Sequence, residues 1–213
     1  MIKVISHRGF WLDEPEKNTE SAFKRSFENN FGTETDIRDF AGNLVISHDV
    51  PDRNAMTVSD FFSLLGDKSL PLALNIKSDG LADILSVEIE KAGIKNAFVF
   101  DMSVPDHKAY LKLSNVAVFS RASEEERHPA FYNLADGIWL DAFYGHWFDE
   151  TLIEKYLNDG KKVCVVSSEL HGRSHIELWT FLKKLKLPPN RNLLLCTDFP
   201  RSAREFFGDY FSD

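Results

Sequence analysis

The sequence predicts an α/β protein, a compact (β/α)8 TIM barrel that forms a single domain over residues 1–213. Short β-rich runs alternate with amphipathic stretches almost from end to end, which is the pattern of a parallel sheet with crossover helices. Eight of these runs end in polar or ionisable residues. A ring of strands collects such ends on one face, whereas an open doubly wound sheet would gather them at one switch point.

The predicted strands are short runs rich in β-branched and aromatic residues. They cover Lys3–His7, Thr33–Phe40, Leu72–Lys77, Ala97–Asp101, Val116–Arg121, Gly137–Ala142, Val163–Ser168 and Leu193–Asp198, with an additional returning strand at Leu44–Asp49. The predicted helices have apolar residues at helical spacing. They cover Thr19–Asn30, Val58–Leu65, Leu81–Ala92, Pro105–Leu113, Asp149–Asn158, Ser174–Leu185 and Arg201–Phe211. The stretch after Arg121 has the weakest helical pattern.

Composition narrows the classes of function. The chain has 213 residues, 43% of them hydrophobic, and no Pro/Gly/Ser-rich linker divides it, so we expect one ordered domain. A net charge of −8 without clustered Lys and Arg argues against nucleic acid as a partner. An anionic substrate would therefore need cations placed locally at its site.

The first residues and the cysteines predict the compartment. No secretory signal pattern or long apolar run follows Met1, so we expect a cytoplasmic protein that does not insert into a membrane. Cys164 and Cys196 lie inside apolar strand-like runs. We interpret both as reduced packing residues rather than as disulfide or zinc ligands. The sequence leaves the oligomeric state open.

A pair of acidic residues on the second strand suggests a site. Glu34 and Asp36 are two residues apart, so both carboxylates project from the same face of a strand. A hairpin turn centred on Gly42 would place Asp36 opposite His48. We therefore expect Glu34, Asp36 and His48 to form one cluster within reach of His7.

These residue types together suit phosphodiester cleavage. Two carboxylates without thiolates favour a hard divalent cation, Ca²⁺ or Mg²⁺, with Mn²⁺ as a further candidate. Two histidines can act as general base and general acid, and Arg8 and Lys77 would supply positive charge against the phosphate. Taken singly, a Glu-x-Asp pair is usually solvated or salt-bridged, and His48 alone could stabilise a turn; the combination is what indicates a site.

Other strand ends offer substrate contacts. We expect Arg121, Trp139 and Asp141 to bind substrate, because each lies at or near the end of a predicted strand. Asp101 and Glu169 are further candidates. Aromatic residues on the same face would line a leaving-group pocket; these are Phe10, Trp11, Trp139 and Trp147.

The ordered motifs resemble those of the glycerophosphodiester phosphodiesterase family, in the wider superfamily that includes phosphatidylinositol phospholipase C. The shared motifs are His7-Arg8-Gly9, Pro15-Glu16 with Asn18-Thr19, Glu34-Thr35-Asp36, Gly42, His48-Asp49 and Thr197-Asp198-Phe199-Pro200. The resemblance implies a hydrolase of lipid and glycerol metabolism that releases sn-glycerol 3-phosphate and an alcohol through a cyclic phosphate.

The resemblance also implies residue roles. His7 and His48 look like the acid/base pair, Glu34 and Asp36 like metal ligands, Arg8 like a phosphate contact, and Lys77 like the basic residue of the third strand.

Three departures from the family pattern affect these expectations. Asn75 stands where a third acidic ligand is usual, and its carbonyl oxygen can still bind Ca²⁺ or Mg²⁺, with weaker affinity expected. Lys17 interrupts the usual Pro-Glu-Asn-Thr run. Only eight residues, Asp49 to Met56, follow His48 before the next helix cap, so we expect little or no inserted lid and an open mouth that admits small or polymeric glycerophosphodiesters.

Two alternatives to hydrolysis remain at this point. A lyase that resembles the phospholipase D toxins would stop at the cyclic phosphate. A non-catalytic protein with a degraded metal site at Asn75 would bind phosphodiesters without turnover, although binding alone has no need for both His7 and His48.

Overall fold

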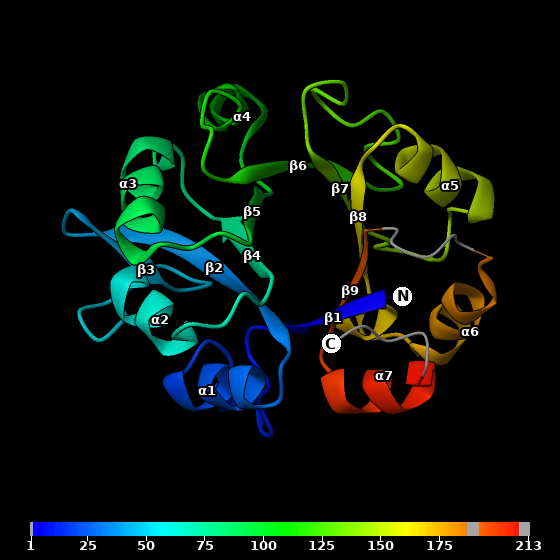
Figure 1. Ribbon diagram of the computed structural model, residues 1–213, viewed down its shortest axis with the longest axis horizontal. Helices are drawn as coiled ribbons and strands as arrows, with labels where there is room; N and C mark the ends of the chain where they lie inside the picture. Colours follow the sequence, from blue (N-terminus) through cyan, green and yellow to red (C-terminus); the bar gives the residue numbers. More distant parts are fainter. Residues whose placement is uncertain (1, 187–191, 209–213) are drawn as a thin grey trace. The chain divides into compact units, whose positions relative to one another are not determined.

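The computed structural model describes residues 2–186 and 192–208, and its fold is a (β/α)8 barrel (Figure 1). The strands are β1 (Ile2–His7), β2 (Gly32–Phe40), β3 (Asn43–Ile46), β4 (Leu72–Ile76), β5 (Ala97–Phe100), β6 (Ala117–Ala122), β7 (Gly137–Leu140), β8 (Lys162–Val166) and β9 (Leu193–Thr197). The strand order is β1-β9-β8-β7-β6-β5-β4-β2-β3, with an additional pairing of β1 with β2 that closes the ring. The antiparallel hairpin strand β3 lies outside that ring.

The helices follow the strands in the alternating order that the sequence predicts. They are α1 (Glu20–Glu28), α2 (Val58–Leu65), α3 (Ala82–Ala92), α4 (Val104–Tyr110), α5 (Glu150–Asn158), α6 (Ile176–Lys184) and α7 (Pro200–Phe207), with short 3-10 turns η1 (Glu14–Glu16) and η2 (Ser168–His171). No helix among the described residues combines the length and the apolar character needed to cross a membrane.

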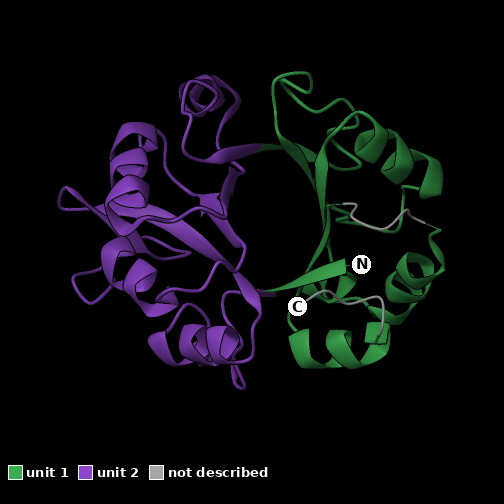
Figure 2. Cartoon of the chain, in the orientation of Figure 1, with its two compact units in different colours: residues 1–5, 119–213 green, residues 6–118 purple. Residues whose placement is uncertain are grey.

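The chain divides into two compact units (Figure 2). Unit 1 comprises residues 1–5 and 119–213, and unit 2 comprises residues 6–118. The boundaries fall within β1 and β6, so each of these two strands contributes residues to both units. Unit 2 contains β2 to β5 with α1 to α4, and unit 1 contains β7 to β9 with α5 to α7.

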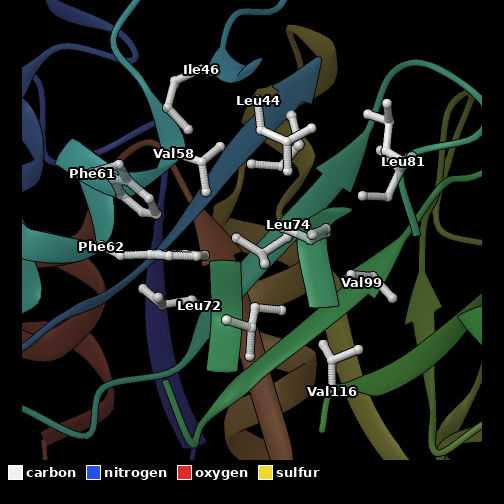
Figure 3. Packing of buried hydrophobic residues seen from close by; sticks show 14 of the residues in the cluster. Leu44, Ile46, Val58, Phe61, Phe62, Leu72, Leu74, Leu81, Val99 and Val116 are labelled. Carbon is white, nitrogen blue, oxygen red and sulfur yellow. The ribbon is translucent and has the colours of Figure 1, made fainter. Parts of the chain in front are cut away.

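Unit 2 is built around a core of buried aliphatic and aromatic side chains (Figure 3). Helix α2 buries Val58, Phe61, Phe62 and Leu65, which recur at the spacing that puts them on one helix face. The strand β4 is buried along its whole length. Full burial of each large apolar side chain stabilises the unit by roughly 1.5–3 kcal/mol, so the amphipathic pattern is sufficient to dock this helix on the sheet.

Side-chain caps set where several helices begin. Thr19, Thr57, Ser103 and Asp149 each accept a hydrogen bond from the backbone N–H three residues later. Such caps satisfy a backbone donor that the helix leaves open, and each contributes about 1 kcal/mol. The predicted starts at Thr19 and Asp149 therefore coincide with the caps, one residue before the first helical residue.

Unit 1 contains parallel pairings throughout its part of the sheet. Arg121 of β6 pairs with Trp139 of β7, and Val166 of β8 pairs with Cys196 of β9. Cys164 and Cys196 are both fully buried, as expected of packing residues. Hydrophobic residues occupy most of β7, β8 and β9, as expected for parallel strands covered on both faces.

Two predicted segments differ from the structure. The hairpin turn contains two residues, Ala41 and Gly42, both at positive φ, so Phe40 pairs with Asn43 and Ile37 with Ile46. The predicted pairing of Asp36 with His48 is therefore wrong by one residue.

The second difference follows β6. Residues 123–136, between β6 and β7, form turns and bends without a helix. In the last helix, Arg201–Phe207 is helical as predicted, whereas positions 209–211 lie outside the described residues. The loop at 47–57 carries no helix or strand of its own within the described part of the chain, in agreement with the expected small insertion.

Candidate active site

The end of β1 turns sharply into the candidate site. Arg8 has φ 56° and Gly9 has φ 86°, both in the left-handed region that few side chains adopt without strain. A Cβ atom on Gly9 would lie 2.7 Å from the Cβ of Ala22. Gly9 N–H donates to Thr33 Oγ1 at 3.0 Å. Glycine at this position is what lets the loop pass against α1.

Glu34 lies at the centre of the predicted cluster. Only 1% of its side chain is exposed, and Oε2 lies 3.9 Å from His7 Nε2. The backbone N–H of Arg8 donates to Oε2 at 3.2 Å, and Asn75 Nδ2 donates to Oε1 at 3.3 Å. Burial, and then the neighbouring Asp36 carboxylate, raise the pKa of Glu34 to about 7. The carboxyl group is therefore poised to lose its proton near neutral pH.

Asp36 lies between the predicted phosphate-binding cations. Its side chain is fully buried, with Oδ2 3.0 Å from Arg8 Nε and Oδ1 3.5 Å from Lys77 Nζ. Asn18 Nδ2 donates to Oδ2 at 2.9 Å. The Arg8 contact is an ion pair without hydrogen-bond geometry. The structure thus brings Arg8, Asp36 and Lys77 together, and the phosphate contacts of Arg8 and Lys77 stay a prediction.

The donors around Glu34 and Asp36 fit an oxygen-preferring cation. Asn75 Oδ1 is buried and has no hydrogen-bond partner among the described residues, and buried Asp36 Oδ1 has only its ion pair with Lys77 at 3.5 Å. Buried oxygens with so few partners are costly unless a ligand completes them. Carboxylate and amide oxygens are the ligands of Mg²⁺ and Ca²⁺. The described residues contain no group of three or more His, Cys, Asp or Glu side chains that could hold a metal, so the amide oxygen of Asn75 would have to complete the donor set.

The hydrogen bonds of His48 are with Arg38 and Asp49, and its place in one cluster with Glu34 and Asp36 stays a prediction. β3 ends at Ile46, and the chain then bends, so His48 lines a pocket of about 400 Å³ together with Arg8, Lys17 and Asn18. His48 Nδ1 lies 2.9 Å from Asp49 Oδ1. A carboxylate only accepts hydrogen bonds, so Nδ1 carries the hydrogen and Nε2 is the nitrogen left for proton transfer.

Two further residues brace the loop that faces this pocket. Besides its contact with Asp36, Asn18 makes two more hydrogen bonds. Its side-chain Oδ1 accepts from Thr35 Oγ1 at 2.9 Å, and its backbone N–H donates to the backbone oxygen of Arg8 at 2.9 Å. Glu16 accepts from Arg25 Nη1 at 2.8 Å and from Leu12 N–H at 2.9 Å, and the Arg25 hydrogen bond is the main cause that lowers the pKa of Glu16. Glu16 therefore holds the loop in shape.

The predicted substrate contacts Arg121, Trp139 and Asp141 lie in unit 1. Arg121 forms an ion pair with Glu126, and its guanidinium lies 5.8 Å from the centre of the Phe143 ring. Trp139 is 5% exposed. Asp141 accepts from His171 Nε2 at 2.6 Å. Their contact with substrate stays a prediction.

Three residues of the pocket had no predicted role. Asn18 belongs to a motif that the sequence made visible, but its contact with Asp36 depends on the fold. Asp49 follows His48 directly, and a carboxylate beside a histidine was an available signal for a hydrogen bond. Lys17 was noticed only as an interruption of a motif, and it lines the pocket.

Comparisons with known proteins support the fold. No protein-family model and no curated protein matches the sequence. Solved structures, in contrast, match the fold of the chain. A protein of Agrobacterium tumefaciens assigned as a glycerophosphoryl diester phosphodiesterase is 13% identical, with a TM-score of 0.75 and coverage of 99% of this chain and 98% of that one.

Two other solved structures agree. A glycerophosphoryl diester phosphodiesterase of Parabacteroides distasonis is 12% identical with a TM-score of 0.70, covering 100% of this chain and 88% of that one. A phosphodiesterase of Oleispira antarctica, solved with the product sn-glycerol 3-phosphate, is 14% identical with a TM-score of 0.66 and covers 96% of both chains. In fold, the chain therefore resembles glycerophosphodiester phosphodiesterases over nearly its whole length.

Proposed function

We propose that this chain is a phosphodiesterase that uses a divalent cation to hydrolyse a glycerophosphodiester into sn-glycerol 3-phosphate and an alcohol. The observation that carries the proposal is the convergence of buried Glu34, Asp36 and Asn75 with the cations Arg8 and Lys77. The likeness to a phosphodiesterase solved with sn-glycerol 3-phosphate supports the choice of substrate class.

The cation would be held by side-chain oxygens of Glu34, Asp36 and Asn75. When bound, a divalent cation neutralises charge on phosphoryl oxygens. Ca²⁺, Mg²⁺ and Mn²⁺ all accept this donor set. Glu34 must lose its proton before it can bind a cation strongly, so cation binding strengthens as pH rises through about 7.

Arg8 and Lys77 would bind the phosphate. Both cations already face Asp36, and both side chains are about one-fifth exposed, so the same groups can contact a phosphate without leaving the site. Fixed positive charge in a partly dry site stabilises the transition state more than the same charge would in water.

The two histidines would move the protons. His7 takes the proton of a glycerol hydroxyl, whose oxygen attacks phosphorus. His48, whose Nδ1–H is held by Asp49, gives a proton from Nε2 to the alcohol oxygen as its bond to phosphorus breaks. Water then opens the cyclic phosphate with the two roles exchanged, and sn-glycerol 3-phosphate results.

The test measures release of sn-glycerol 3-phosphate from a panel of glycerophosphodiesters with Ca²⁺, Mg²⁺, Mn²⁺ or EDTA. We expect cation-dependent release that falls by about 10²–10⁴-fold in His48→Ala. His128→Ala, at an exposed histidine of unit 1, is the matched control and should match the wild type.

Two outcomes would change the proposal. A cyclic phosphate that persists in the phosphorus NMR spectrum would identify a lyase in place of a hydrolase. Binding of phosphodiesters without turnover under any cation would overturn the enzymatic proposal and favour a binding protein.

A further inference from the structure

The pocket beside His48 is lined by charged side chains of both signs. Its lining includes the cations Arg8 and Lys17 and the acids Asp49 and Asp52. Three of these four are engaged within the site or within their own loop. Arg8 faces Asp36 at 3.0 Å, Asp49 is bonded to His48 at 2.9 Å, and Asp52 accepts from Asn54 N–H at 2.8 Å.

Lys17 has a weaker competing partner. Its Nζ lies 3.3 Å from Oε1 of Glu14, whose side chain is 82% exposed, whereas the Lys17 side chain is only 22% exposed. Water screens an ion pair of this kind, so little free energy is lost when another anion replaces the glutamate. Glu14 is not among the residues that line the pocket.

Lys17 is also held in place for a ligand. Its Nζ lies 4.6 Å from the centre of the Trp11 ring, and Trp11 Nε1 donates to the backbone oxygen of His7 at 3.2 Å. On its other side, Asn18 is tied to Arg8 and Asp36. A lysine ordered before binding loses less side-chain entropy when it contacts a ligand.

We propose that Lys17 selects diesters whose alcohol group carries a second anionic group, a carboxylate or a phosphate. The proposal rests on the proposed function, because it takes the pocket beside His48 as the place of the leaving alcohol. Arg8 then serves the reacting phosphate, and Lys17 serves the additional anion. The residue is a specificity determinant and takes no part in bond making or breaking.

The experiment compares four diesters that differ in the charge of the alcohol group. These are glycerophosphocholine, glycerophosphoglycerol, the phosphate monoester of glycerophosphoglycerol, and the glycerophosphodiester of glycerate. The variants are Lys17→Met, which keeps the aliphatic chain, and Lys17→Glu. Lys24→Met is the control, because Lys24 forms a comparable exposed pair with Glu20 on α1 and is absent from the pocket lining.

We expect Lys17→Met to raise KM for the two anionic diesters by roughly tenfold, the effect of one charge-assisted contact. KM for glycerophosphoglycerol should stay unchanged, and Lys17→Glu should favour glycerophosphocholine. The anionic diester with the larger change identifies whether carboxylate or phosphate is preferred. Equal changes for all four diesters, or none, would overturn the proposal while leaving the hydrolase intact.

Binding separates failure of the proposal from failure of the proposed function. Calorimetry with His48→Ala, alone and combined with Lys17→Met, measures Kd for the same four diesters without turnover. If the wild type hydrolyses none of them but Lys17→Met still weakens only the anionic ones, the pocket assignment holds and the hydrolase proposal fails. If Lys17→Met instead weakens the binding of all four diesters equally, the proposed role of Lys17 is overturned.

Discussion

The two units treat the acidic residues near their strand ends differently. In unit 1, Glu169 accepts hydrogen bonds from Ser167 Oγ, Thr197 Oγ1 and Asp198 N–H, which joins the ends of β8 and β9. In unit 2, Asp36 Oδ1 and Asn75 Oδ1 are buried without a hydrogen-bond partner in the described part of the chain. A satisfied carboxylate stabilises a fold, whereas unsatisfied buried oxygens indicate a place for a ligand.

The most direct way to break this comparison is to neutralise one carboxyl group in each unit. Glu34→Gln should reduce turnover on the order of 10³-fold, because the variant removes a proposed cation ligand and keeps the shape of the side chain. Glu169→Gln should instead lower the free energy of unfolding by about 1.5–3 kcal/mol, because hydrogen bonds to a charged group become neutral ones. Steady-state kinetics and urea unfolding of both variants measure the two effects. Equal losses of turnover in the two variants would contradict the difference between the two units.

The pH dependence of stability sharpens the comparison. The folded pKa of Glu34, about 7, lies above its ordinary value of 4.5, so its protonated form stabilises the cation-free protein below pH 4.5. That contribution is lost as pH rises through 7, by roughly 3 kcal/mol. Urea unfolding in EDTA between pH 4.5 and pH 8 should show the loss in the wild type.

Glu34→Gln supplies the control for this measurement, because its side chain cannot ionise. The variant should have a flatter stability curve over the same pH range, and Mg²⁺ should restore stability only to the wild type at pH 8. Parallel curves for the two proteins would show that Glu34 keeps an ordinary pKa.

Two glycine substitutions separate the energetic cost of close packing from the cost of backbone strain. Gly9→Ala should lower the free energy of unfolding by roughly 2–3 kcal/mol, because the added Cβ meets Ala22 and φ is 86°. Gly160→Ala in unit 1 has φ 80° but no described heavy atom within 4 Å of the added Cβ, so it should cost only about 1 kcal/mol. Equal losses would show that the loop at Gly9 moves away from α1.

Much of the fold could be predicted because it depends on local pattern. Amphipathic spacing located α2 at the observed residues, and the alternation of strands and helices indicated the ring. The register of the hairpin could not be read with the same accuracy. Moving the turn from a centre at Gly42 to the pair Ala41 and Gly42 shifts every partner by one residue and exchanges the faces.

The candidate site was predicted where neighbours along a strand decide the geometry. Glu34 and Asp36 share a cluster because alternate residues share a face, and Lys77 follows β4 beside them. The contacts of Asn18 with Asp36, or of Glu169 with Thr197, join residues far apart in sequence. Such contacts depend on how loops close on the folded sheet, which no local pattern records.

The backbone of the loop after β1 places stability and the proposed catalysis in opposition. Arg8 and Asn18 both have positive φ, 56° and 61°, and a hydrogen bond from Asn18 N–H to Arg8 O joins them. Glycine would relieve the strain at either position, but it would remove the guanidinium or the amide that faces Asp36. In laboratory evolution, selection for heat resistance alone would therefore favour glycine at position 8, whereas selection for turnover would favour arginine.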